Sequence, residues 1–421
     1  MLEIIHNVEH SKEGTYYTIP FTVPDGVEKI TVSYEYQRGA KGLMGDLHPT
    51  NVIDIGLADE KGRFLGWSGS AHSKISVGEF SSSNGYLCEK INPGEWKIII
   101  GAYHVLETGV QVKYSVDFEM KAEKLLLGDL HIHSDASDGK FDTYTLGKMA
   151  QKAGLDFIGI ANHNNFAENF CLPHQDGLTF IKAVEWTHYK GHMNFFGVNA
   201  PFENSFIANS RDEMHKIISD ARSMGAVISV NHPKCRFCPY LWEDENAFDM
   251  MEIWNGPMRP SNLDAVIWWT ELLRAGRKIP IVGGSDYHRP HSLARLANPV
   301  TAVLSPSKSA DDILNSIKNG RSFVTNGVDG PKLDVRYGEA TLGETVRRGS
   351  AEKLIIAAEN LGNAEIITVN DCGEEKAARK SGEDSVFEVN PGSSSFIYVK
   401  AIKGKGKLRR ICAITNPIYF E

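Results

Sequence analysis

Cysteine is scarce in this sequence and spread widely along it. The 421 residues contain six cysteines, which are too few and too scattered for a disulfide framework. One pair, Cys235 and Cys238, forms a CxxC motif in KCRFCP. A zinc knuckle usually needs a second pair of ligands, and none follows nearby in the sequence. We therefore expect two reduced thiols in a loop there, rather than a structural zinc or redox site.

Long apolar runs and concentrated positive charge are also missing. No segment approaches the roughly 18 consecutive apolar residues of a membrane helix. The first residues, MLEIIHNVEHSKEG, have neither the basic start nor the apolar stretch of a signal peptide. The formal net charge is -8 without any basic run, which disfavours nucleic acid and anionic membranes as partners. We expect a cytoplasmic protein acting on a small-molecule substrate; the sequence leaves its oligomeric state open.

The length of the chain predicts two or three domains rather than a single core. Residues 1–122 contain aromatic and β-branched segments separated by turn signals, a pattern typical of a β-sandwich. Residues 331–421 return to the same character and predict a small C-terminal β-sandwich. Between them, over 125–328, apolar strands alternate with amphipathic helices. This alternation favours a barrel-like α/β domain with parallel strands.

Two segments of the central region carry complete helix signatures. In TYTLGKMAQKAG, Leu146 and Ala150 lie at helical spacing, and Gly154 stands where a C-cap is expected. In SRDEMHKIISDARSMG, Ser210 and Glu213 fit a capping box ahead of an apolar face. Further helices are expected in LDAVIWWTELLRAG and ADDILNSIKNG.

The stretch GDLHIHSDASDG, residues 128–139, concentrates titratable groups directly after an apolar strand. On an extended segment, the side chains of His131 and His133 point the same way. Such a pair alone is usually part of a polar surface loop. Comparable groups follow the other predicted strands, however, and the C-terminal ends of parallel strands meet at one face of a barrel. The groups are His131, His133, Asp135 and Asp138, then His163, then Glu185, His188 and His192, then His232, then Asp286 and His288.

Histidine is enriched in the same region. Ten of the fifteen histidines lie between residues 131 and 291. Imidazole and carboxylate ligands without cysteine suit Zn²⁺, Mn²⁺ or Fe²⁺, and there are more candidate ligands than one ion requires. The pattern therefore predicts two or three divalent ions (Zn, Mn or Fe) that share a carboxylate, an arrangement that activates water for hydrolysis.

These motifs resemble the PHP superfamily, named for polymerase and histidinol phosphatase. DLHIHSDASDG is similar to its first motif, IANHN to the second, AVEWT with GH to the third, NHP to the fourth and SDYH to the last. The sequence segments around these motifs, such as GHMNFFG and MEIWNG, look most similar to a carbaryl-hydrolase-like branch of the superfamily. The resemblance covers about 125–328 and implies a distorted (β/α)7 TIM-like barrel with two or three metal ions, here flanked by the two β-sandwich domains.

The resemblance also implies a role for the motif residues. His131 and His133 would bind one ion, and Glu185 would bridge this ion and the next one. As ligands of the ions that activate water, Glu185, Asp286 and His288 would be catalytic. The full implied metal shell is His131, His133, Asp138, His163, Glu185, His192, His232, Asp286 and His288.

The second motif departs from the family pattern, because Asn162 precedes His163 where an aspartate is usual. If that aspartate only orients a ligand, an amide still supplies a hydrogen bond and the site survives. If it takes part in acid–base catalysis, asparagine cannot replace it, since the amide does not titrate near neutral pH. Ala183, where a glycine is common before the bridging glutamate, is a second and tolerable departure.

The expected reaction is hydrolysis of a phosphoester by a hydroxide that bridges the ions of a di- or trinuclear centre. His291 is expected to protonate the leaving oxygen, with His188 and Asp135 as further candidates. Arg289 and Lys234 follow strand-end ligands and would hold the phosphate, with surface salt bridges as the alternative.

Two other functions remain open. In the second, the same metal centre would cleave a carbamate or a carboxylic ester, and an apolar substrate would lie against Trp254. A non-catalytic protein that holds metal only structurally is the third reading, and it predicts erosion of the ligand set, which the sequence does not show.

Overall fold

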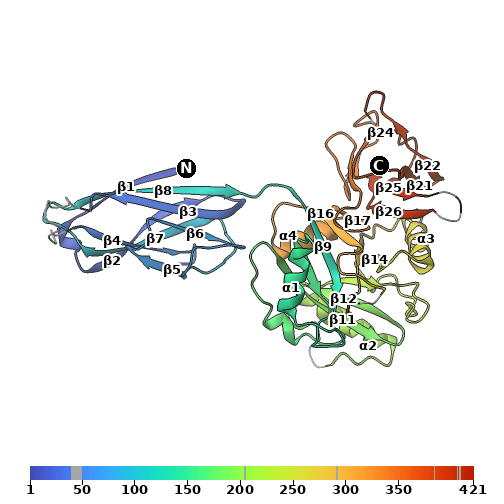
Figure 1. Cartoon of the computed structure of the whole chain (residues 1–421), viewed down its shortest axis with the longest axis horizontal. Coiled ribbons are helices and arrows are strands. Elements are labelled where there is room, and N and C mark those ends of the chain that lie inside the picture. Colours follow the sequence, from blue (N-terminus) through green and yellow to red (C-terminus); the bar gives the residue numbers. More distant parts are fainter. Residues whose placement is uncertain (39–49, 203–204, 291–292, 384, 405, 407–408) are drawn as a thin grey trace. The chain divides into compact units, whose positions relative to one another are not determined.

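The computed structural model describes residues 1–421 except 39–49, 203–204, 291–292, 384, 405 and 407–408 (Figure 1). The chain divides into two compact units, Met1–Ala122 and Glu123–Glu421. Over the described part of the chain, no helix has the length and apolar character needed to cross a membrane. His291, the expected proton donor, lies outside the described residues.

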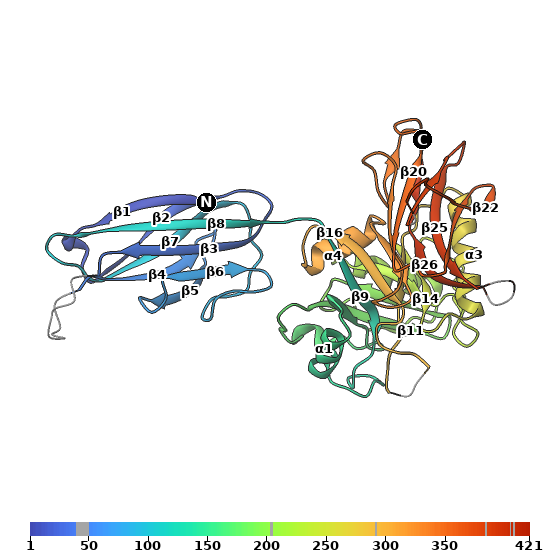
Figure 2. The ribbon, with the colours of Figure 1, turned by 45° about the horizontal axis from the view of Figure 1, so that its top comes forward.

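Two four-stranded antiparallel sheets build the first unit. One has the order β1-β8-β3-β6 and the other β2-β7-β4-β5. Val32 and Val112 from the first sheet and Ile55 and Ile98 from the second belong to one buried cluster, so the sheets form two packed layers (Figure 2). The strands are β1 (Leu2–Val8), β2 (Thr15–Val23), β3 (Val27–Tyr36), β4 (Val52–Ala58), β5 (Phe64–Gly69), β6 (Lys74–Gly78), β7 (Gly94–His104) and β8 (Val110–Met120).

One sheet of fifteen strands runs through the second unit. Its main order is β15-β14-β13-β12-β11-β10-β9-β16-β17-β26-β25-β21-β22, with β27 beside β25 and β19. Its strands up to β17 are β9 (Lys124–Ile132), β10 (Phe157–Ile160), β11 (Thr179–His188), β12 (Gly191–Phe196), β13 (Val227–Asn231), β14 (Met250–Asn255), β15 (Ile281–Gly284), β16 (Val300–Ser305) and β17 (Ser322–Thr325). The later ones are β19 (Thr345–Val346), β21 (Glu365–Asn370), β22 (Gly373–Lys376), β25 (Phe396–Lys403), β26 (Arg410–Thr415) and β27 (Ile418–Phe420).

A second, four-stranded sheet completes the C-terminal part in the order β18-β20-β24-β23. It comprises β18 (Lys332–Arg336), β20 (Leu354–Glu359), β23 (Ala378–Arg379) and β24 (Val386–Val389). The second unit is therefore a strand-rich mixture of α and β structure, which confirms the expected α/β class at this level.

The seven strands from β9 to β15 are neighbours in chain order. They pair in parallel, except that β12 is antiparallel to both β11 and β13. The segment GHMNFF of β12 has neither a regular alternation nor a continuous apolar run, and the sequence did not predict it as a strand. Its hairpin with β11 takes the place of a helix in the β–α alternation.

The helices expected from the sequence are all present in the second unit. They are α1 (Thr143–Lys152), α2 (Arg211–Ser223), α3 (Pro260–Arg274) and α4 (Ala310–Lys318). The side chains of Asp142, Ser210 and Ser309 each accept a hydrogen bond from a backbone N–H of the first turn and cap α1, α2 and α4. Helix α1 packs on β10, α3 on β14 and α4 on β16.

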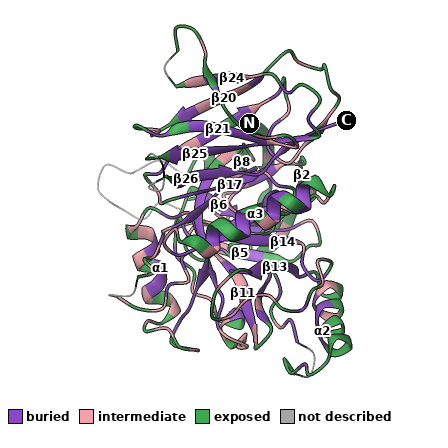
Figure 3. Ribbon diagram, turned by 90° about the vertical axis from the view of Figure 1, so that its right-hand side faces the viewer, coloured by how far each residue is buried: buried purple, intermediate pink, exposed green. Residues whose placement is uncertain are grey.

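The C-terminal strands share both the sheet and the apolar core of the preceding region. β17 pairs with β26, and one buried cluster joins Trp269 and Val324 to Tyr398 and Ile414. Figure 3 shows β17, β25 and β26 as buried strands lying side by side. The sequence also predicted a domain boundary near 328–331, between the barrel and a C-terminal β-sandwich. That boundary stays a prediction.

Hydrogen bonds bring the end of β9 against the segment that follows β15. The Asp286 N–H donates to the His131 carbonyl at 2.8 Å, and the His133 N–H donates to the Tyr287 carbonyl at 3.0 Å. Gly284 allows this approach, because a Cβ there would lie 2.4 Å from the His131 Cβ. Two sequence-distant motifs, HIH and SDYH, are thereby fixed side by side.

Candidate metal centre

The nine residues expected to bind metal converge in the second unit. Eight of them, together with Cys238, form three constellations, two of which share His133, and within each constellation the ligand atoms lie within 4.8 Å of one another. Glu185 adjoins these constellations through contacts with their histidines. The constellations are His131, His133 and Asp286; His133, Asp138, His163 and His288; and His192, His232 and Cys238.

Glu185 lies at the centre of the histidines. This side chain is 1 % exposed. Its Oε1 lies 3.3 Å from His131 Nε2, 3.1 Å from His192 Nδ1 and 3.3 Å from His232 Nε2. Its Oε2 lies 3.5 Å from His133 Nε2 and 2.8 Å from His163 Nδ1. One carboxylate thus faces histidines from β9, β12 and the segments after β9, β10 and β13, as a bridging ligand must.

Three buried nitrogen atoms of the cluster have no hydrogen-bond partner among the residues that the structure describes. They are His131 Nε2 and both ring nitrogens of His133, and both side chains are fully buried. Buried polar atoms are almost always hydrogen-bonded, so unpaired ones call for an explanation such as an ion. Imidazole and carboxylate donors in this number fit divalent Zn, Mn or Fe.

Two of the nine expected ligands adopt a strained backbone conformation. His232, directly after β13, and Asp286, two residues after β15, have φ values of 30° and 54°. Residues other than glycine rarely adopt this left-handed region. Such strain persists where the surrounding structure enforces it, and it clusters at functional sites.

The charges of the cluster are strongly coupled. Burial opposes the charged form of Glu185, but the histidines around it, His131 first, hold its pKa well below the ordinary value. Burial likewise opposes charging of His131, yet the carboxylates of Glu252 and Glu185 raise its pKa well above the ordinary value. Burial lowers the pKa of His133 to about 4. Bound cations would replace the protons of this cluster, so metal binding releases protons.

Two buried acids that the sequence did not single out hold the expected ligands in place. Glu252 in β14 accepts from His131 Nδ1 at 2.9 Å through Oε1 and from the His232 N–H at 3.0 Å through Oε2. Asp129 accepts from the backbone N–H groups of His131, Ser285 and Ala297, and burial raises its pKa to about 6. A carboxylate on the outer nitrogen of a metal-binding histidine fixes the ring and its tautomer.

Asn162 has a partner that explains the departure from the usual aspartate. Its Oδ1 accepts from the Ser134 N–H at 2.9 Å and from Ser137 Oγ at 2.9 Å. Its Nδ2 donates to Glu168 Oε2 at 2.6 Å, and Glu168 lies in the short 3₁₀ turn Ala167–Phe170. The amide therefore holds the loop after His133, while Glu168 supplies a carboxylate beside it. These contacts are those of a positioning residue.

Restoring the usual residue by Asn162→Asp is expected to destabilise the protein by about 1–3 kcal/mol, because it replaces the donor to Glu168 by a second acceptor. Thermal unfolding of the full chain, followed with and without added metal, measures the loss as a lower transition temperature. The double variant Asn162→Asp/Glu168→Gln, which restores a donor, should recover most of it. A single variant as stable as the parent and faster in turnover would contradict this assignment.

The residues expected to bind substrate are dispersed. Arg289 donates to the Asp138 carbonyl at 2.9 Å and lies beside the centre. The Lys234 ammonium lies 4.3 Å from the centroid of the Trp268 ring. Trp254 is 2 % exposed within the apolar core and donates to the Gly256 carbonyl. Arg289 thus lies beside one of the expected ligands, and the three binding roles stay predictions.

The two other acid candidates differ in their surroundings. Asp135 is exposed in the loop after β9. His188 accepts from the Lys190 N–H at Nδ1 and donates to the Ala208 carbonyl from Nε2. These bonds fix the neutral tautomer, and burial lowers the pKa of His188, which disfavours a proton-donating role.

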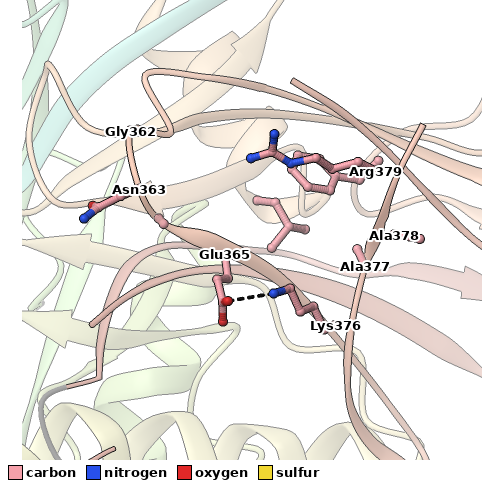
Figure 4. Close-up of a pocket in the computed structure, with 10 residues that line it drawn as sticks. Gly362, Asn363, Glu365, Lys376, Ala377, Ala378 and Arg379 are labelled. Atoms are coloured by element: carbon pink, nitrogen blue, oxygen red, sulfur yellow. Dashed lines mark hydrogen bonds and ion pairs between the residues drawn. The ribbon is translucent and has the colours of Figure 1, made fainter. Parts of the chain in front are cut away.

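A cavity of about 600 Å³ adjoins the centre at His192 and Cys238. Its wall is largely apolar and holds no lysine or arginine among the described residues that line it. These are Asn164, Thr187, His188, Tyr189, His192, Phe206, Ile207, Ala208, Asn209, Phe237 and Cys238. A second cavity of about 580 Å³ lies near β21–β23, where Lys376 pairs with Glu365 at 2.7 Å (Figure 4), and none of the expected site residues lines it.

No protein-family model and no curated protein matches the chain. Solved structures similar to it include a two-domain protein from Bacteroides vulgatus that contains a predicted PHP-like metal-dependent phosphoesterase. The two sequences are 16% identical, the match covers 68% of this chain and 88% of that chain, and the TM-score is 0.40. PsfC from Pseudomonas syringae has 16% identity, 46% and 90% coverage and a TM-score of 0.37. The lesion-specific endonuclease PfuEndoQ from Pyrococcus furiosus has 18% identity, 46% and 56% coverage and a TM-score of 0.35.

Proposed function

We propose that the second unit is a metal-dependent phosphoesterase of the PHP type, built on a distorted (β/α)7 barrel of β9–β15. The observation that carries the proposal is the convergence of five histidines on the buried carboxylate of Glu185. Bound there, two or three divalent ions would supply an activated water and neutralise charge on phosphoryl oxygens. His131, His133, Glu185 and Asp286 would hold one ion, His192 and His232 a second, and Asp138, His163 and His288 a third, with Glu185 lying between the first and its neighbours.

The exposure of these side chains supports a direction of entry for the substrate. His131, His133 and Glu185 are buried and form the floor of the site. Asp138 is half exposed, and the side chains of His163 and His288 are 28% and 22% exposed. A phosphoryl group would therefore approach along Asp138 and His288, whose Oδ1 and Nε2 lie 3.2 Å apart. Arg289, which holds the Asp138 loop, is the nearest expected anion-binding side chain.

The neighbouring cavity indicates the organic part of the substrate. Phe206, Ile207 and Phe237 supply apolar surface beside His192. A polyanion such as a nucleoside triphosphate would need cationic walls, whereas an apolar alcohol would bury surface there without losing hydrogen bonds. We therefore propose a phosphate mono- or diester with an aromatic or other apolar group.

Turnover of a small panel by the metal-reconstituted full chain tests this function. The panel consists of p-nitrophenyl phosphate, bis-p-nitrophenyl phosphate, 1-naphthyl phosphate and 1-naphthyl N-methylcarbamate. We expect hydrolysis of phosphate esters, loss of that activity on treatment with a chelator, and recovery when Zn²⁺ or Mn²⁺ is restored. Hydrolysis of the carbamate alone would replace the phosphoester by a carbamate or carboxylic ester as the substrate. Absence of all turnover would leave a metal-containing binding protein.

A further inference from the structure

Cys238, which the sequence suggested to be an ordinary loop thiol, stands beside two of the proposed ligands. Cys238 Sγ belongs to one constellation with ligand atoms of His192 and His232, and it lies 3.5 Å from His232 Nδ1. In a tetrahedral zinc site, bond lengths of about 2.3 Å to sulfur and about 2.0–2.1 Å to nitrogen place these two atoms about 3.6 Å apart. The observed separation matches this distance, as it does that of a thiol–imidazole hydrogen bond, and it joins Cys238 to His232 Nδ1, whereas Nε2 of the same ring faces Glu185.

The loop that carries Cys238 is anchored against the ligands. The Cys235 N–H donates to the His232 carbonyl at 2.8 Å, and the Tyr240 N–H donates to the Pro233 carbonyl at 2.9 Å, so the segment after β13 folds back on itself. Gly191, with φ of 119°, permits contact with β12, since a Cβ there would lie 2.9 Å from the Tyr240 Cα. The glycine that precedes His192 thus lets the cysteine loop close over that ligand.

We propose that Cys238 is a thiolate ligand of an ion held by His192 and by Nδ1 of His232, on the side of that ring away from Glu185, which makes this ion chemically different from those bound by nitrogen and oxygen alone. The inference rests on the proposed metal centre. A sulfur ligand favours Zn²⁺ over Mn²⁺ at this position, and it places the thiolate on the wall of the apolar cavity. Cys235, whose Sγ lies 3.1 Å from that of Cys238, is a free thiol and accepts from the Phe237 N–H.

Cobalt substitution tests the sulfur ligand independently of catalysis. The full chain is stripped with a chelator, reconstituted with Co²⁺ without oxygen, and examined for bound cobalt and for its absorption spectrum. We expect a near-ultraviolet charge-transfer band from thiolate to Co²⁺ in the parent protein. The band should be lost in Cys238→Ser and retained in the matched control Cys235→Ser, with circular dichroism used to establish that both variants are folded.

The outcomes separate this inference from the proposed function. Bound cobalt without the band in the parent, or a band that persists in Cys238→Ser, overturns the thiolate ligand and leaves a hydrolytic centre of nitrogen and oxygen ligands. Loss of the band in Cys235→Ser as well overturns the assignment to Cys238 alone. Failure to bind cobalt at all overturns both the inference and the proposed function.

Discussion

Replacing Glu185 with alanine is expected to lower kcat/KM for phosphoesters by roughly 10³-fold or more, because bound ions contribute several kcal/mol of charge stabilisation in the transition state. Glu185 is within ion-pair distance of five histidine rings. Its removal leaves those rings without the negative charge that would hold two cations close together. Bound metal, measured by elemental analysis, and initial rates at saturating metal together report the loss.

Two further substitutions sharpen this experiment. Glu185→Gln keeps the volume of the side chain but not its charge, so a similar loss of metal would assign the effect to charge. Glu271, exposed on α3, offers a matched control, since Glu271→Gln should retain parental metal content and rate. A folded Glu185→Ala variant with unchanged metal and turnover would remove the bridging role.

Glu252→Gln is expected to weaken metal binding by about 10- to 100-fold, the usual cost of disturbing the partners of metal-binding histidines. Both carboxylate oxygens of Glu252 are used, one by His131 Nδ1 and the other by the His232 N–H and Asn255 Nδ2. An amide offers a single acceptor oxygen. One of these donors therefore faces an NH₂ group, and His131 or His232 loses its fixed orientation.

Competition with a chromogenic chelator measures this change in affinity. Because Glu252 positions ligands without touching substrate, kcat at saturating metal should recover far more than in the Glu185 variants. Unchanged affinity would show that His131 is oriented by packing alone. A loss of kcat that excess metal cannot restore would instead place Glu252 in the catalytic step.

The convergence of the expected ligands was predictable because chemistry and chain order largely coincide. Most of these histidines and acids lie in or shortly after a predicted strand, and the C-terminal ends of neighbouring parallel strands meet; His192 instead lies in β12, which the sequence did not predict. The structure brings together all nine expected ligands, although their roles as ligands stay predictions. The helices could also be predicted from the sequence, since capping residues such as Ser210 and periodic apolar residues mark their bounds.

Other features depend on partners that a sequence pattern does not identify. Glu252 lies in the strand segment MEIW, which is buried along its whole length. A buried carboxylate needs hydrogen-bond donors, but the sequence does not show which residues supply them. The pairing of β17 with β26 joins residues about ninety positions apart, which strand propensity alone does not specify. The CxxC motif has no second pair of ligands nearby in the sequence, because His192 comes close to Cys238 only through the β11–β12 hairpin.

Metal content is the most direct test of the proposed centre. After removal of metal and reconstitution with Zn²⁺, Mn²⁺ or Fe²⁺, the purified full chain should retain about two or three equivalents per chain. The same preparation should hydrolyse p-nitrophenyl phosphate or its diester. Less than one equivalent, with no hydrolysis of any ester, would contradict a polynuclear hydrolytic centre around Glu185.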